Sequence, residues 1–140
     1  MQQSAGEPAA SRSSDARSEI ILDSGPELPD LAPAIHRQRL VIEGTRAEPI
    51  TEHDIREYLS QLCVVCDMVP LIDPVTHHSE RYGWAGWIHW ETSGAHFYAW
   101  DSPTVFFSVD VYACRAFDSV ATVEFTREFF GAEQLVAKAL

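Results

Sequence analysis

The sequence predicts an α+β fold, a two-layer sandwich in which two helices cover one face of an antiparallel sheet. Two segments repeat apolar residues at helical spacing, and the segments around them are short and rich in β-branched and aromatic residues. The predicted order, β-α-β-β-β-α-β, is typical of a sheet with its helices on one side. With 46 % hydrophobic residues among 140, the chain can build one buried core.

The first 34 residues differ in composition from the rest of the chain. They are rich in Ser, Ala, Pro and acidic residues, and their main apolar patch is 20–22. A segment of this kind buries too little apolar surface to offset the entropy lost on folding. We therefore expect a disordered tail over 1–34 and one domain over 35–140.

The domain begins with a strand and a helix. Residues 37–44 predict a strand that a glycine turn closes. Thr51 and Asp54 then stand three residues apart, which is the spacing of a capping box, and apolar residues recur behind them at helical spacing. We expect the first helix to run from about Thr51 to about Asp67.

The middle of the chain predicts the central strands. Residues 69–75 favour a strand at a sheet edge, because a proline cannot donate a hydrogen bond to a neighbour, and 77–83 favour a polar loop. Residues 84–91 and 95–100 predict a strand pair or one kinked strand, with the bend at Ser93-Gly94.

The last elements complete the sandwich. Residues 105–112 form the clearest strand of the chain. Asp118 is a candidate N-cap for a second helix, which Gly131 ends at the position that a C-terminal glycine usually takes. Residues 135–137 are expected to close the sheet.

The composition excludes several partners. A net charge of −11 leaves no basic surface to neutralise phosphates, so nucleic acid is not expected to bind, whereas a small cation is compatible with it. No segment approaches the roughly 18 apolar residues of a membrane span. Three cysteines and a start without the apolar segment of a secretion signal favour free thiols in the reducing cytoplasm.

Two further motifs have both a functional and a structural interpretation. Cys63-Val64-Val65-Cys66 matches redox and zinc motifs, but it lies near the end of a helix, where no N-terminus stabilises a thiolate, so core packing is favoured. His77 and His78, with His89 and Glu91, are of metal-ligand types. Nothing in the sequence fixes their geometry, and no metal is predicted.

Two stretches resemble the active-site region of bacterial S-adenosylmethionine decarboxylases. They are 91–100, with the sequence ETSGAHFYAW, and 108–114, with the sequence SVDVYAC. In that family a serine, a short strand and a V-D-V/L-aromatic-x-C strand recur at nearly this spacing, and the order of elements fits over about residues 36–138. The resemblance implies the α+β sandwich, decarboxylation of S-adenosylmethionine for spermidine synthesis, and a homodimer with active sites near the subunit interface.

The resemblance also implies a pyruvoyl cofactor that is made from the chain itself. A serine hydroxyl attacks the preceding carbonyl, the resulting ester eliminates, and the chain is cut. The new keto group binds the substrate amine and accepts the electrons released with carbon dioxide. The resemblance assigns the pyruvoyl precursor to Ser93, the cleavage to the Thr92–Ser93 bond, and the proton donor to Cys114.

The chain departs from the family at three positions that assist cleavage. Thr92 stands for the glutamate before the serine, Tyr98 for the histidine five residues after it, and Ala85 for the serine eight residues before it, whereas Gly86 is retained. Strand alternation puts His96 on the side of the strand that Tyr98 occupies, which makes His96 a candidate replacement for the missing histidine.

Other candidate residues surround the predicted cut. Thr92, which follows Glu91, is an alternative nucleophile, but the spacing to Cys114 favours Ser93. Trp87 and Glu91 share one face of a strand, opposite to Trp90. An indole can stack on adenine, so Trp87 and Glu91 are the candidate substrate-binding residues, the carboxylate for a ribose hydroxyl or the substrate ammonium.

Three functions are open from the sequence. The first is pyruvoyl-dependent decarboxylation of S-adenosylmethionine. The second is an uncut homologue that binds S-adenosylmethionine or regulates another protein without catalysis. The third is decarboxylation of another cationic amino acid, such as ornithine or arginine, which the acidic balance of the chain also suits.

Overall fold

The computed structural model describes residues 9–12, 19–22 and 27–140, in two units that comprise residues 1–33 and 34–140. In the first unit, β1 (Ala9–Arg12) pairs with β2 (Glu19–Leu22) in antiparallel register, with Ala9 opposite Leu22. The other residues of 1–26 lie outside the described residues, so the disordered tail over 1–34 stays a prediction.

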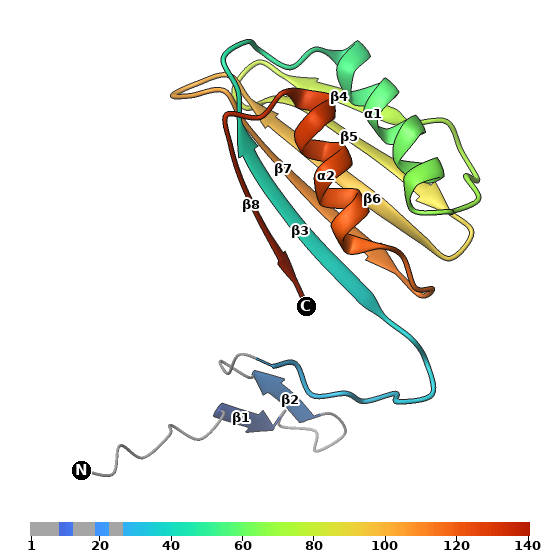
Figure 1. Ribbon diagram of the computed structural model, residues 1–140. Coiled ribbons are helices and arrows are strands. Elements are labelled where there is room, and N and C mark those ends of the chain that lie inside the picture. The colour runs from blue at the N-terminus through green and yellow to red at the C-terminus, as the bar shows by residue number, and fades with distance from the viewer. Residues whose placement is uncertain (1–8, 13–18, 23–26) are drawn as a thin grey trace. The chain divides into compact units, whose positions relative to one another are not determined.

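The second unit is the predicted α+β sandwich, with one strand more than the predicted order. Its elements are β3 (Gln38–Thr45), α1 (Glu52–Val65), β4 (Val75–Ser79), β5 (Gly83–Trp90), β6 (Ser93–Trp100), β7 (Phe106–Ala113), α2 (Ser119–Phe130) and β8 (Gln134–Ala139). The six strands form one sheet in the order β4-β5-β6-β7-β3-β8, and all neighbours are antiparallel. Both helices lie on one face of this sheet (Figure 1), as predicted.

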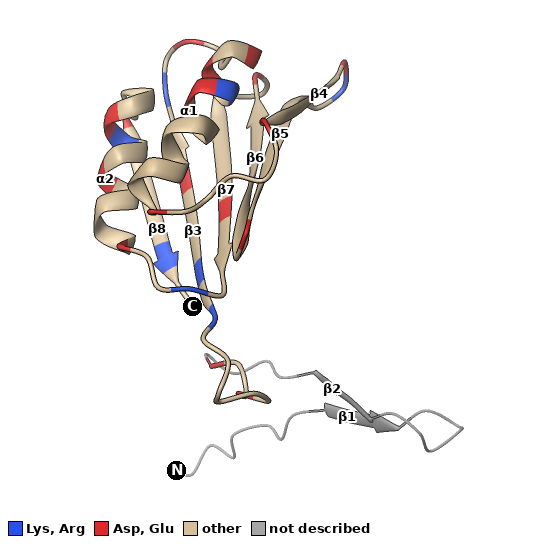
Figure 2. Cartoon of the chain, turned by 90° about the vertical axis from the view of Figure 1, so that its right-hand side faces the viewer, with Lys and Arg blue, Asp and Glu red and all other residues tan. Residues whose placement is uncertain are grey.

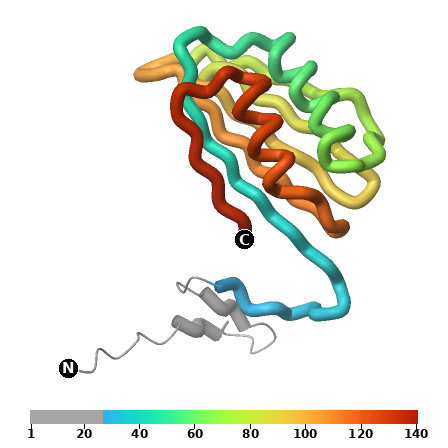
Figure 3. The backbone as a smooth tube through the Cα atoms, in the orientation of Figure 1, coloured from blue at the N-terminus to red at the C-terminus, as the bar shows by residue number. Residues whose placement is uncertain are grey.

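The edge-on view shows that neither helix of this unit lies on the other face of the sheet (Figure 2). We call this surface the open face and the opposite one the helix face. The helices lie side by side across the helix face (Figure 3). Neither α1 nor α2 is long and apolar enough to cross a membrane.

Both helices begin and end as local chemistry dictates. Asp54 N–H donates to the Thr51 hydroxyl while the Asp54 carboxylate accepts from Thr51 N–H, which confirms the capping box. α1 ends two residues before the predicted boundary, with Cys66 as its C-cap. For α2, Asp118 is the N-cap and Gly131 ends the helix in the left-handed conformation, both as predicted.

The predicted strand over 69–75 is wrong. There the structure has an isolated bridge between Pro70 and Trp90, and regular pairing with β5 begins only at Val75, the first residue of β4. The edge strand is β4, five residues long, and it contains the histidines that were predicted in a polar loop.

The bend predicted at Ser93-Gly94 is also wrong. Glu91 and Thr92 form the turn, and β6 begins at Ser93, which pairs with Trp90. A Cβ at Gly94 would lie 2.8 Å from the carbonyl oxygen of Ile88, so this glycine permits a close approach of β5 and β6 instead of a bend.

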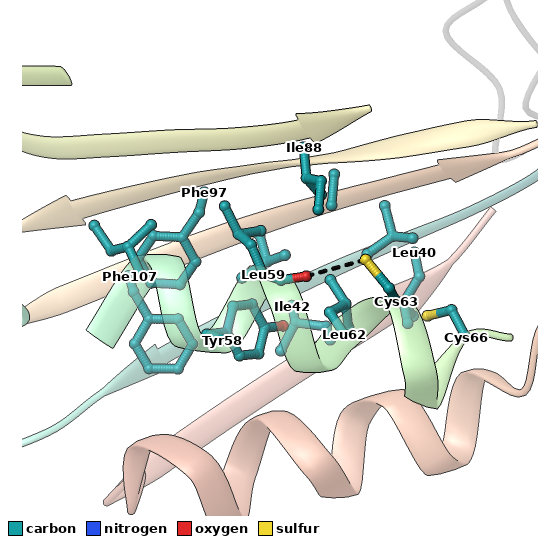
Figure 4. Close-up of a cluster of buried hydrophobic side chains, with 14 of the residues drawn as sticks. Leu40, Ile42, Tyr58, Leu59, Leu62, Cys63, Cys66, Ile88, Phe97 and Phe107 are labelled. Carbon is teal, nitrogen blue, oxygen red and sulfur yellow. Dashed lines mark hydrogen bonds between the residues drawn. The ribbon is translucent and has the colours of Figure 1, made fainter. Parts of the chain in front are cut away.

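The core lies between the helix face and the two helices. Tyr58 is fully buried among phenylalanines, and its hydroxyl lies 2.8 Å from that of Thr126. Cys63 donates its thiol proton to the carbonyl oxygen of Leu59 (Figure 4). Cys63 and Cys66 are both buried and free, which confirms the prediction that they pack in the core.

Candidate functional site

The predicted nucleophile lies at the first position of β6, next to the turn between β5 and β6. Ser93 pairs with Trp90 on β5 and with Ala113 on β7. Its side chain is 8 % exposed and its Oγ donates to the Sδ of Met68 at 3.3 Å. The Ser93 hydroxyl therefore points to the helix face.

The scissile carbonyl is held by the end of β7. The N–H of Cys114 donates a 2.8 Å hydrogen bond to the carbonyl oxygen of Thr92. The Cys114 thiol is exposed and lies 3.7 Å from the hydroxyl of Tyr112. The structure thus brings Thr92, Ser93 and Cys114 together at one end of the sheet.

Both hydroxyls at the predicted cut share one acceptor. Thr92 Oγ1 donates to Met68 Sδ at 3.4 Å, and the two hydroxyl oxygens are 3.3 Å apart. No histidine or carboxylate within 27–140 forms a hydrogen bond with either hydroxyl. The uncut chain therefore holds the nucleophile without an adjacent base.

A second group of candidate residues lies on the open face. The hydroxyl of Tyr98 is 3.3 Å from Nδ1 of His96, and His96 pairs with Trp87 across β5 and β6. Trp87 and Tyr98 are each 40 % exposed. With parts of β4, these side chains line a shallow depression of about 200 Å³.

Two of the positions at which the chain departs from the family pattern face each other in this depression. Ala85 is the register partner of Tyr98, and it also pairs with His77 on β4. All three residues line the depression. His77, which was predicted in a loop, is thereby a titratable residue of β4 that lines the depression.

The two groups of residues are separate in the uncut chain. His96 lies three positions after Ser93 on β6, which at 3.4 Å a residue is about 10 Å along the strand. Ser93 points to the helix face, whereas His96 and Tyr98 point to the open face. His96 and Tyr98 therefore do not contact the scissile bond.

Two candidate residues, Glu91 and His89, lie outside both groups. Glu91 is exposed in the turn, where its N–H donates to the carbonyl oxygen of Val69 at 2.9 Å. Trp87 and His89 are exposed and Trp90 is buried, which confirms the predicted alternation along β5. Among the described residues, no three His, Cys, Asp or Glu side chains gather as a metal ion would require.

The structure adds one residue that the sequence analysis missed. Met68 is 7 % exposed and contacts both hydroxyls at the predicted cut. It follows α1 by three residues, and no motif in the sequence relates it to residues 92 and 93. Only the packing of the end of α1 against the turn after β5 reveals it.

Comparisons with known proteins agree on one family. A family model described as S-adenosylmethionine decarboxylase matches residues 39–140. The chain is also similar to the crystal structure of the adenosylmethionine decarboxylase from Aquifex aeolicus VF5, with 12 % sequence identity and a TM-score of 0.63 over 76 % of this chain and 89 % of that one. That likeness shows the fold alone. No curated protein matches the sequence.

Proposed function

Because the chain belongs to the S-adenosylmethionine decarboxylase family, we propose that it cuts itself between Thr92 and Ser93 and then decarboxylates S-adenosylmethionine for spermidine synthesis. One observation carries the proposal. The register of β6 and β7 joins the two residues that the family resemblance singles out, because Cys114 N–H binds the carbonyl oxygen that precedes Ser93.

The cut is an acyl shift followed by an elimination. A bond forms between Ser93 Oγ and the carbonyl carbon of Thr92 while the C–N bond breaks, and the hydroxyl proton ends on the nitrogen of Ser93. Loss of the Ser93 Cα proton then breaks the Cβ–Oγ bond and releases the carboxylate of Thr92. Uptake of water and release of ammonia leave a keto group at the head of residues 93–140.

We assign two roles to Cys114, one in the cut and one in the decarboxylation. Its N–H polarises the carbonyl under attack and stabilises the negative charge that develops on that oxygen. Its exposed thiol, which donates to the Tyr112 hydroxyl at 3.7 Å in the uncut chain, can deliver a proton to the product after carbon dioxide has left. The residues around position 93 therefore fit a pyruvoyl group, which when present binds the substrate amine and accepts the electrons of the broken C–C bond.

We place the substrate on the open face, where the exposed Cys114 thiol lies against Tyr112. Residue 93 faces the helix side in the uncut chain, so this placement requires the new terminus to turn to the open face once the Thr92–Ser93 bond is broken. Trp87 and Tyr98 present exposed rings that can stack on adenine or face the sulfonium cation, in a chain whose net charge is −11. Glu91, exposed in the turn, can meet the substrate ammonium. Because His96 and Tyr98 lie away from the scissile bond, we assign them to the substrate and not to cleavage.

The same face suits a homodimer. Trp87, Tyr98 and Tyr112 are each about 40 % exposed on it, with values of 40 %, 40 % and 39 %. Aromatic rings concentrated on a sheet surface that no helix covers are typical of an interface core. Gel filtration at two protein concentrations checks this point. The free thiols suit a reducing compartment, the cytoplasm.

Intact mass of freshly purified protein tests the proposed function. We expect the 15.7 kDa chain to give two species, residues 1–92 and 93–140, with a carbonyl reagent labelling only the second. Ser93→Ala is expected to stay whole, and Thr92→Val to be cut, which separates the two possible nucleophiles.

A wild-type chain that stays whole and unlabelled would overturn the proposal. Calorimetry with S-adenosylmethionine would then show whether the uncut chain is a binding homologue. If the chain is cut but releases carbon dioxide faster from ornithine or arginine than from S-adenosylmethionine, the cleavage stands and the substrate assignment is wrong.

A further inference from the structure

The segment 67–71, which we call the strap, runs along the hairpin end that carries the scissile bond. Glu91 N–H donates to Val69 and Leu71 N–H donates to His89, both at 2.9 Å, and Pro70 bridges Trp90. The strap thus touches three consecutive residues before Thr92.

The end of α1 fixes where the strap begins. Asp67 takes the left-handed conformation, with φ of 54°, and its N–H donates to Val64 while Met68 N–H donates to Cys63 at 2.8 Å. These are the two hydrogen bonds of a Schellman motif. The Asp67 carboxylate also binds Arg115 at 2.7 Å, directly after Cys114. The segment around Met68 therefore contacts both future fragments, residues 89–91 through the strap and Arg115 through Asp67.

The Met68 side chain ends at the two hydroxyls. Its Sδ accepts from Ser93 at 3.3 Å and from Thr92 at 3.4 Å, in a site where Met68 and Ser93 are 7 % and 8 % exposed. A thioether is a weak acceptor and takes no proton near neutral pH. It can therefore orient a hydroxyl without holding it as firmly as a carboxylate or an amide would.

We infer that Met68 is a positioning residue for the self-cleavage, in which its sulfur orients the Ser93 hydroxyl before attack on the Thr92 carbonyl. This inference rests on the proposed function. The sulfur takes no part in bond making, and the acyl shift proceeds as written above. Its contribution is to reduce the rotamers that the nucleophile must search.

Replacement of the sulfur by a methylene tests the inference. The chain has two methionines, Met1 and Met68. Norleucine, incorporated in a methionine auxotroph, keeps the length of the side chain and removes the acceptor, whereas selenomethionine keeps an acceptor of similar strength. The matched control is Met68→Leu grown with norleucine and with methionine, because only Met1 then differs between the two preparations.

Cleavage is followed by intact mass in protein that is recovered from inclusion bodies in urea and then refolded, because only chains that have not yet folded start whole. We expect norleucine to slow the appearance of residues 93–140 about five- to twentyfold, selenomethionine to restore the wild-type rate, and the control pair to cleave alike. The thermal midpoint of norleucine protein in a Ser93→Ala background should equal or exceed that of its methionine form, since norleucine is the more apolar residue.

The outcomes separate the two proposals. A cut wild type with an unchanged rate in norleucine protein overturns the role of Met68 and leaves the proposed function intact. A slower rate together with a lowered thermal midpoint also overturns it, because packing then explains the loss. A wild type that is never cut, even after refolding, ends the proposed function and the role of Met68 with it.

Discussion

The N–H of Cys114 and the carbonyl oxygen of Thr92 are 2.8 Å apart, so a residue at the end of β7 holds the bond at the start of β6. This contact belongs to the main chain and does not depend on the thiol. The two roles that we assign to Cys114 can therefore be separated by mutation.

Cys114→Ala is expected to be cut normally and to lose decarboxylation. Alanine keeps the N–H that polarises the Thr92 carbonyl, whereas the proton donor is lost, and a positioned acid contributes about 10²- to 10⁴-fold to a rate. Intact mass measures the cut and release of labelled carbon dioxide measures the turnover. An uncut Cys114→Ala chain would show that the thiol itself is needed for cleavage.

The three thiols are expected to react very unequally with iodoacetamide. Burial raises the pKa of the Cys66 thiol to about 11 and also raises that of Cys63, whereas Cys114 is exposed. At pH 8 in native buffer, peptide mapping should find the label on Cys114 and on the other two only after urea is added. Rapid native labelling of Cys63 or Cys66 would contradict the buried positions described above.

His96→Ala is expected to leave self-cleavage unchanged and to weaken the reaction with substrate. His96 lies about 10 Å from Ser93 along β6, and the two side chains point to opposite faces of the sheet. Intact mass should show wild-type amounts of both fragments, while kcat/KM falls about tenfold or more. The matched control is His89→Ala, because His89 lies on β5 and also faces the open face but does not line the depression. A cleavage defect specific to His96→Ala would place this histidine in the cutting step.

The ionised Asp54 carboxylate is expected to stabilise the fold, and this stabilisation should be lost at acidic pH. Burial raises the pKa of its carboxyl, but hydrogen bonds from Thr51 and Arg46 outweigh this and hold the pKa below its ordinary value of 3.8. A lowered pKa adds stability above the unfolded value, and this contribution is lost as the pH falls through the folded value.

Urea unfolding of Ser93→Ala and Ser93→Ala/Asp54→Asn measures this effect in uncut protein. At pH 7 the Asn variant should be less stable by about 0.5–1 kcal/mol. The difference should shrink below about pH 4 as the Asp54 carboxylate takes up its proton. A difference that is constant from pH 7 to pH 3 would show that the charge of Asp54 contributes nothing.

Local chemistry predicted the helices well and the sheet edge poorly. The capping pair Thr51 and Asp54 and the terminal Gly131 act within a few residues, so the sequence contains all the information needed to place them. The strand over 69–75 was predicted from its apolar residues, but Val69 and Leu71 lie on the strap and only Val75 belongs to a strand. β4 forms instead at 75–79, where only pairing with β5 identifies the strand.

The sequence likewise predicted one part of the candidate site and missed another. Alternation correctly put His96 and Tyr98 on one face, because it depends on β6 alone. It could not reveal that Ser93 occupies the other face at the start of β6, since the turn position depends on how β5 and β6 are paired. Met68 was missed because its contact with Ser93 spans two elements that no sequence spacing connects.

The strand order has a thermodynamic consequence for the cut molecule. β3, β4 and β5 precede residue 93 and β6, β7 and β8 follow it, yet β3 lies between β7 and β8, and β5 pairs with β6. The two fragments can separate only if the hydrogen bonds between β5 and β6, between β7 and β3, and between β3 and β8 break. Unfolding of the cut protein is then a bimolecular equilibrium governed by mass action, with a midpoint that rises with concentration.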